Sequence, residues 1–310
     1  MLSKSKSTRN SKVSKNANMP IIPIDLLPDI FQHFENDRQA IYNCVFVNRA
    51  FCRTAIRILW QDPFEVNTPR KSTWPYANYR AAENIISLYL ACLSYQDRKT
   101  LSKIKNLKIP QRPTFNYPQF LKYFDEQSVY IYIRSGQFYN NKLGEVTEAY
   151  SIHSAIMNLT LRESQRLHYI TFECSYIFEK APCKLTSLRH IQFNTRSSGV
   201  DMPKRQAENV ANLIRHQIHL ESFTTSSLTA GLSTLFDALA IQIRTLKQLE
   251  FVLCDFSHFD WAEHEQLLES IDKLVLKRCT NVPLSMVENL SIFKEKQITW
   301  DAYTFSRKHI

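Results

Sequence analysis

Apolar residues near the N-terminus recur with the spacing of amphipathic helices. A first helix is predicted by the i, i+3, i+4, i+7 pattern of Leu27, Ile30, Phe31 and Phe34. Pro28 falls at the first position of that helix, where the missing N–H of proline has no intrahelical acceptor to lose. A second helix is predicted over residues 40–45. A third is predicted over residues 51–60, where adjacent apolar pairs recur every four residues until Pro63 ends the run.

The three predicted helices form a module of about 40 residues, near the size below which a domain usually needs disulfides, metals or oligomerisation. No set of metal ligands occurs in this stretch. One interpretation is that the module packs on the rest of the chain. The other is that it presents its surplus apolar surface to a partner protein.

A change of composition marks a boundary after this module. Residues 65–78 contain prolines, asparagines and a short basic patch, and they are predicted to link two packed units. A helix is predicted over residues 79–93, and the apolar run that follows it stops at Pro110. Residues 117–124 are expected to include a short helix. The alternation of apolar residues over 129–133 favours a strand.

From about residue 149 the apolar pattern repeats at a longer interval. The template L-x-x-L-x-L-x-x-[NC], whose first, fourth and sixth residues fill a core, starts at residues 167, 188, 220, 246 and 271. Thr225 replaces the third apolar residue in one copy, and a frayed further copy is predicted at Ile298 and Trp300. Stretches with helical spacing precede the copies at 220 and 246, and Pro203 opens the first of them. This alternation predicts a solenoid with a parallel sheet, and the alternative is an ordinary α/β domain.

In such a solenoid the third, fifth and seventh template positions project from the concave face of the sheet. The candidate target-binding residues on that face are Tyr169, Thr171, Glu173, His190, Gln192, Asn194, Gln248, Glu250, Val252, Lys273, Val275 and Lys277. The set mixes aromatic, amide and oppositely charged side chains, which suits a protein surface better than a uniformly anionic backbone. For any single residue of the set, the alternative is a side chain that meets only solvent.

The formal net charge of +10 is concentrated near the N-terminus. Residues 1–18 contain five basic and no acidic residues, and residues 1–19 are predicted to be a disordered basic tail. The basic residues are spaced apart, so an import signal is not assigned, and a weak import or phosphate-binding segment is the alternative. The remaining 34 basic residues face 29 acidic ones, so nucleic acid is not an expected partner.

Length and composition indicate a folded chain with more than one unit. Of its 310 residues 44% are hydrophobic, and its seven scattered cysteines contain no C-x-x-C pair. They are therefore expected to be reduced. No stretch approaches the roughly 20 apolar residues that cross a bilayer, and residues 1–18 lack the apolar core of a signal peptide. We expect no membrane insertion and a location in the cytoplasm, the nucleus or both.

The sequence lacks the motifs of familiar enzyme sites. None of the four glycines lies in a phosphate-binding loop or a nucleophile elbow. His264-Glu265 lacks the second histidine of a zinc-protease helix. His216 and His219 are better explained as a solvated helix end than as a metal pair. We therefore expect no catalytic residue, no metal site and no cofactor.

The order of motifs in the N-terminal module resembles the F-box. The resemblance rests on Leu27-Pro28, on Ile30-Phe31, on the stretch from Cys44 to Cys52 and on the closing Ile58-Leu59-Trp60. At Ala50-Phe51 the sequence departs from the commonest pattern, which has an apolar residue followed by tryptophan. The resemblance implies that residues 20–64 dock on the Skp-family linker subunit of an SCF-type cullin–RING ubiquitin ligase. The residues implied to meet the linker are Leu27, Pro28, Ile30, Phe31, Val45, Val47, Leu59 and Trp60.

Residues 79–310 resemble the irregular leucine-rich repeats of fungal F-box proteins. The two resemblances together imply an α/β chain in which a three-helix F-box precedes an irregular leucine-rich-repeat-like solenoid of alternating helices and parallel strands. They imply an adaptor without an active site, which reaches a cullin through the linker and holds an unknown target protein. The alternative is a basic repeat scaffold that binds protein or nucleic acid without a ligase and uses residues 20–64 as a helical cap.

Overall fold

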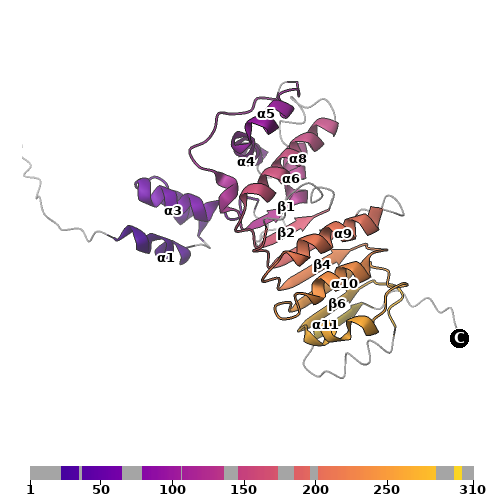
Figure 1. The fold of residues 1–310 in the computed structure, drawn as a ribbon. Helices are drawn as coiled ribbons and strands as arrows, with labels where there is room; N and C mark the ends of the chain where they lie inside the picture. Colours follow the sequence, from indigo (N-terminus) through magenta and orange to yellow (C-terminus); the bar gives the residue numbers. More distant parts are fainter. Residues whose placement is uncertain are drawn as a thin grey trace, which may run out of the picture. The chain divides into compact units, whose positions relative to one another are not determined.

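The chain divides into two units by its internal contacts, Met1–Ile58 and Leu59–Ile310 (Figure 1). The computed structural model describes residues 22–34, 37–64, 79–105, 107–135, 146–173, 185–195, 202–283 and 297–301. The predicted basic tail at 1–19 and the predicted linker at 65–78 lie outside the described residues. The observed division after Ile58 precedes the predicted boundary, so the short segment Leu59–Phe64 belongs with the second unit.

Short helices form the N-terminal unit, close to where the apolar spacing predicts them. They are the 3-10 turn η1 (Ile24–Leu26) and the helices α1 (Leu27–Gln32), α2 (Arg38–Cys44) and α3 (Arg49–Leu59). The Asp37 carboxylate accepts a hydrogen bond from Ala40 N at 2.9 Å and so caps α2. The Asn48 side chain does the same for α3 by accepting from Ala50 N at 2.9 Å. Polar side chains therefore fix where these two helices begin.

Helices also open the second unit, ahead of and around its first strand. They are α4 (Tyr79–Cys92), α5 (Tyr95–Leu101), the 3-10 turn η3 (Tyr117–Phe120), α6 (Glu126–Ser135) and α8 (Val146–Glu163). The Arg98 guanidinium on α5 donates hydrogen bonds to the carbonyls of Ala91 and Leu93, and to Pro110 O at 2.9 Å. One side chain therefore satisfies carbonyls at the end of α4 and holds the following loop.

One prediction for this part of the chain holds in part and another is wrong. Residues 117–120 form a short 3-10 helix, but Phe124 lies in strand β1 (Tyr123–Asp125). The stretch 129–133 lies in helix α6 and is not a strand. Val129 and Ile133 are both buried one helical turn apart, whereas Ile131 between them is half-buried. The buried side of this helix is therefore set by apolar residues four positions apart. The alternation of apolar residues at every second position only resembles the pattern of a strand.

The strands of the described residues form one parallel sheet in chain order, which confirms the predicted alternation of helices and parallel strands. After β1 come β2 (Tyr169–Phe172), β3 (His190–Asn194), β4 (Ser222–Ser226), β5 (Gln248–Val252), β6 (Lys273–Lys277) and β7 (Gln297–Asp301). Between the later strands lie α9 (Met202–Arg215), α10 (Leu232–Ala240), the 3-10 turn η5 (Ala262–His264) and α11 (Glu265–Ser270). Figure 1 shows α9, α10 and α11 following one another along the sheet.

The strands pair in the register that the repeat template predicts. Residues at the fourth template position are neighbours in the order Ile170, Ile191, Phe223, Leu249, Leu274 and Ile298. Residues at the sixth position are neighbours in the order Phe172, Phe193, Thr225, Phe251, Leu276 and Trp300. From β2 to β6 these side chains are buried, and Phe236 of α10 stacks on Phe251 with ring centroids 5.3 Å apart. The core therefore lies between the sheet and its helices.

A repeat that the sequence pattern does not predict begins at Leu121. Leu121 and Phe124 are buried at its first and fourth positions, but Glu126 takes the place of the third apolar residue. Glu126 is only 4% exposed, and its Oε2 accepts a hydrogen bond from Glu173 N at 2.6 Å. A charged residue therefore replaces a core residue where β1 passes into α6.

The backbone of Gln61 serves as a cap for this first repeat. Its carbonyl accepts hydrogen bonds from Lys122 N at 2.9 Å and Tyr123 N at 3.1 Å. In the next repeat the carbonyl of Lys122 accepts the same pair of bonds, from His168 N and Tyr169 N. Gln61 therefore stands where the second residue of a preceding repeat would stand.

Aromatic packing holds this cap in place. Phe64 is 1% exposed, and its ring meets that of Phe124 edge-on at 5.9 Å. The ring of Trp60 lies 4.2 Å from that of Tyr117 and 6.0 Å from that of Tyr89, centroid to centroid. Phe64 thus belongs to the hydrophobic core of the second unit, and Trp60 packs against that core.

Buried polar side chains join successive repeats near the start of each template. Ser164 Oγ donates to Pro118 O at 2.7 Å, and Gln217 Nε2 donates to Leu185 O at 2.7 Å. Gln242 Nε2 in turn donates to Gln217 O at 2.9 Å. Each acceptor carbonyl lies three residues before the template start of its own repeat. We term these side chains the polar ladder, and each one donates a hydrogen bond to a backbone carbonyl of the preceding repeat.

Candidate protein-binding surfaces

Large apolar side chains are exposed on the N-terminal unit. Of the twelve exposed large hydrophobic side chains in the described part of the chain, seven belong to this unit. They are termed the exposed apolar set and comprise Ile22, Ile24, Leu26, Phe34, Tyr42, Phe46 and Val47. Phe46 is 70% exposed, and its ring meets that of Tyr42 edge-on at 5.2 Å. Exposed apolar residues are normal when scattered singly, but a concentration of them is a feature of protein-binding surfaces.

The residues predicted to meet a linker subunit are only partly at the surface of this unit. Leu27 and Phe31 are buried in its own small core. At the surface are Pro28 and Val47, which are exposed, and Ile30 and Val45, which are half-buried. Leu59 and Trp60 are grouped with the second unit, where Trp60 packs on Tyr117. The structure therefore brings four of the eight predicted residues to the surface of the N-terminal unit.

Sequence reasoning did not single out several of the most exposed apolar residues. Leu26 and Phe46 are exposed, whereas Leu27, Phe31 and Ile41 are buried. A usable signal was present, because Leu26 and Phe46 are apolar but fall outside the stripes that the buried residues form. An apolar residue outside the buried stripe of a helix must face solvent or a partner.

The open face of the sheet carries the predicted target-binding residues of the second unit. At β1 to β3 it bears a row of rings, in which Tyr123 and Tyr169 lie 6.4 Å apart and Tyr169 and His190 lie 6.2 Å apart, centroid to centroid. The Tyr169 hydroxyl donates to Gln192 Oε1 at 3.0 Å and accepts from Thr171 Oγ1 at 3.0 Å. Burial lowers the pKa of His190, which is therefore neutral at neutral pH. The rings and the amide of this row therefore form an aromatic and hydrogen-bonding surface.

The other end of the open face is charged with both signs. Lys277 Nζ lies 2.6 Å from Glu250 Oε1, and Lys273 pairs in register with Gln248 on the neighbouring strand. Three other predicted target-binding residues, Glu173, Asn194 and Val252, are half-buried and so remain partly accessible. Thr171 and Val275 are buried and contribute little accessible surface. Apart from these two residues, the sheet brings the predicted set together on one face.

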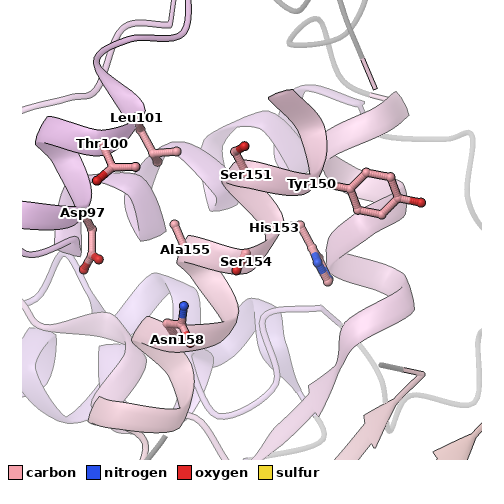
Figure 2. Close-up of a pocket in the computed structure, with 9 residues that line it drawn as sticks. All are labelled: Asp97, Thr100, Leu101, Tyr150, Ser151, His153, Ser154, Ala155 and Asn158. Atoms are coloured by element: carbon pink, nitrogen blue, oxygen red, sulfur yellow. The ribbon is translucent and has the colours of Figure 1, made fainter. Parts of the chain in front are cut away.

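A hollow of about 430 Å³ lies between α5 and α8. It is lined by Asp97, Thr100, Leu101, Tyr150, Ser151, His153, Ser154, Ala155 and Asn158. In Figure 2, Asp97 and Leu101 lie across from Ala155, whereas Tyr150 projects away from them. Asp97 Oδ2 already accepts a hydrogen bond from Ser94 Oγ at 2.6 Å and lies 3.5 Å from Arg162 Nη1. Its charge is therefore partnered within the fold.

His153, one of the residues that line the hollow, forms a buried pair with Glu126. His153 Nε2 lies 3.5 Å from Glu126 Oε1, and both side chains are less than a tenth exposed. Burial lowers the pKa of His153 to about 4, against which the neighbouring Glu126 acts. The imidazole is therefore neutral at neutral pH, and the pair joins α8 to the first residue of α6.

The histidines that were considered as possible catalytic or metal-binding residues lie at a helix end or in the core. His216 and His219 are exposed, and His216 Nδ1 makes a 2.7 Å hydrogen bond with Asn212 O near the end of α9. His264 is buried and stacks on the ring of Phe259 at 5.0 Å. Among the described residues no three or more histidine, cysteine or acidic side chains gather as a metal site would require.

The described helices also include none with the length and apolar character that a bilayer span needs. No protein-family model, no curated protein and no solved structure matches the chain. Function is therefore inferred from the exposed apolar set, the open face of the sheet and the motifs in the sequence.

Proposed function

We propose that the chain is a substrate-recognition adaptor of an SCF-type cullin–RING ubiquitin ligase. In this proposal the N-terminal unit docks on the Skp-family linker subunit, and the open face of the sheet binds a target protein. The observation that carries the proposal is the exposed apolar set, because a unit this small leaves seven large apolar side chains in solvent. The F-box-like order of its motifs supports a linker subunit as the partner.

The adaptor would act by proximity and would need no chemistry of its own. Binding the target and the ligase at once raises the effective concentration of the target near the ubiquitin-charged enzyme. That gain depends on the length and stiffness of the connection between the two binding parts. Here only Trp60 separates the last residue of α3, Leu59, from Gln61, which caps the sheet.

The first test measures binding of purified linker subunit to the full chain by calorimetric titration. The double variant Phe46→Ala/Val47→Ala is expected to bind at least 30-fold more weakly, since truncated anchors at an interface centre cost about 2 kcal/mol or more. The matched control is Ile218→Ala/Ile241→Ala, which removes two side chains that are each 61% exposed in the second unit. The control is expected to bind as the unaltered chain does.

A deletion gives a second, independent readout. It should remove residues 22–58 and keep the chain from Leu59 onward, because Gln61 and Phe64 belong to the fold of the second unit. Loss of linker binding by the folded deletion variant would support the adaptor role. Absence of binding by the folded full chain, or equal binding by the deletion variant, would contradict it and favour a repeat scaffold outside a ligase.

A further inference from the structure

Two cysteines occupy equivalent places in consecutive repeats. Cys254 and Cys279 are the ninth template residues that follow β5 and β6. The next residues, Asp255 and Thr280, form a parallel bridge. Thr280 N donates to Cys254 O at 2.9 Å, and Thr280 O accepts a hydrogen bond from Phe256 N at 3.0 Å. The two cysteines are therefore in register on neighbouring chain segments.

This register places the cysteines at a separation that a disulfide can span. Paired segments lie about 4.8 Å apart, and residues in register on parallel segments point to the same side. A disulfide requires Cα atoms about 4.4–6.8 Å apart. Cys279 Sγ lies 3.4 Å from Phe251 O, so it reaches across to the repeat of Cys254. Cys254 Sγ lies 3.5 Å from Val252 O, and Cys279 Sγ lies 3.6 Å from Lys277 O, the equivalent carbonyl of the next repeat.

We propose that Cys254 and Cys279 are an oxidative modification site, in which a hydroperoxide converts the thiol pair into a disulfide that joins the two repeats. Cys279 is half-buried, whereas Cys254 is 1% exposed. The accessible Cys279 is therefore the residue that meets the oxidant, and Cys254 is the resolving residue. This pairing of an accessible thiol with a neighbouring resolving cysteine is typical of redox-responsive sites.

The chemistry balances in two steps. The Cys279 thiolate attacks one oxygen of the hydroperoxide, the O–O bond breaks, and a sulfenic acid forms as the alkoxide or hydroxide leaves and takes up a proton. The sulfur of Cys254 then attacks the sulfenic sulfur, and the S–S bond forms as hydroxide leaves and takes the Cys254 proton to give water. The neighbouring Cys254 thiol lowers the pKa of Cys279, which favours the thiolate that the first step needs.

The bond would change how the repeats separate. Repeats in a solenoid contact only their neighbours, so the end of the array can open while the rest stays folded. A covalent link between the segments after β5 and β6 would prevent that opening. It would hold the charged end of the open face, where Lys277 and Glu250 pair, in one arrangement. This inference does not depend on the proposed ligase role.

The test uses the full chain treated with hydrogen peroxide, blocked with iodoacetamide and digested with trypsin without reductant. The two cysteines lie in separate tryptic peptides, residues 248–273 and 279–294, each with a single cysteine. Mass spectrometry is expected to find these two peptides joined, and dithiothreitol is expected to separate them. Cys92, which is half-buried and whose thiol pKa is raised by burial, serves as the internal reference and is expected to oxidise more slowly.

Two variants test the assigned roles. In Cys254→Ser the sulfenic acid on Cys279 has no resolving partner, so dimedone should label Cys279. In Cys279→Ser dimedone should leave Cys254 unlabelled. The proposal would be overturned if Cys254 and Cys279 of the unaltered chain were still free thiols when Cys92 has already oxidised. A disulfide that links either cysteine mainly to another residue would also overturn it. The result for the unaltered chain decides the matter even where a variant does not fold.

Discussion

Gln217 provides a direct measure of what the polar ladder contributes. Its side chain is 5% exposed, and its Oε1 accepts a hydrogen bond from Leu188 N at 3.1 Å. Its Nε2 donates to Leu185 O and Leu213 O, both at 2.7 Å. Methionine has a similar length but cannot replace these bonds. Gln217→Met would therefore remove three hydrogen bonds at one buried site while keeping most of the packing.

The expected loss follows from the three bonds. Each contributes about 1 kcal/mol net, and a buried backbone group left without its partner costs about 1–3 kcal/mol. Leu213 O lies within helix α9, so the groups that depend most on this side chain are Leu188 N and Leu185 O. Methionine returns roughly 1 kcal/mol through its apolar surface. We expect the free energy of unfolding to fall by about 2–4 kcal/mol.

The assay is urea unfolding of the full chain followed by circular dichroism. The matched control is Gln248→Met, at a half-buried position on the open face, which is expected to change stability by less than about 0.5 kcal/mol. The slope against urea should stay the same, because the variant changes few contacts in the unfolded chain. A loss under about 1 kcal/mol, or a loss equal to that of the control, would refute the ladder as a stabilising device.

Three other residues give further predictions. Trp60→Ala is expected to cost about 3 kcal/mol in thermal unfolding, because its ring packs on Tyr117, while the affinity of the folded variant for linker subunit stays within about threefold. Arg98→Met should cost about 2 kcal/mol in urea unfolding, because carbonyls of the α4 end and the next loop lose a charged donor. The pKa of His153 is about 4 in the fold and near 6.5 when unfolded, so falling pH protonates the unfolded chain first. Stability should therefore be about 2 kcal/mol lower at pH 5 than at pH 7, and His153→Gln should remove that difference, which urea unfolding at both pH values will measure.

The repeat register was predictable because one physical rule sets it. Parallel strands of a solenoid bury the same template positions, so the apolar residues of each copy must align. The alignment of Ile191 with Phe223 and of Leu249 with Leu274 follows directly from counting residues in the sequence. The accessible face follows as well, since side chains alternate along a strand.

The elements that escaped prediction have particular causes. The first repeat was missed because Glu126 replaces a core residue and finds its partner, the backbone of Glu173, far along the chain. Helix α6 was taken for a strand because its apolar residues happen to alternate. The packing of Trp60 on Tyr117 was not predicted, because a motif cannot show which unit a side chain packs on. The contacts of Glu126 and Trp60 join residues distant in sequence, whereas the error at α6 comes from its local pattern.

The cap at Gln61 also protects the protein from associating with copies of itself. β1 is the first strand of the sheet, and an edge strand with free N–H groups is a template on which another chain can add a strand. The carbonyl of Gln61 already occupies Lys122 N and Tyr123 N at this edge. A chain cut after Phe64 would expose both donors together with the core around Phe124. Such fragments would offer an open sheet edge to which another chain could add a strand, whereas in the intact chain Gln61 occupies these two donors.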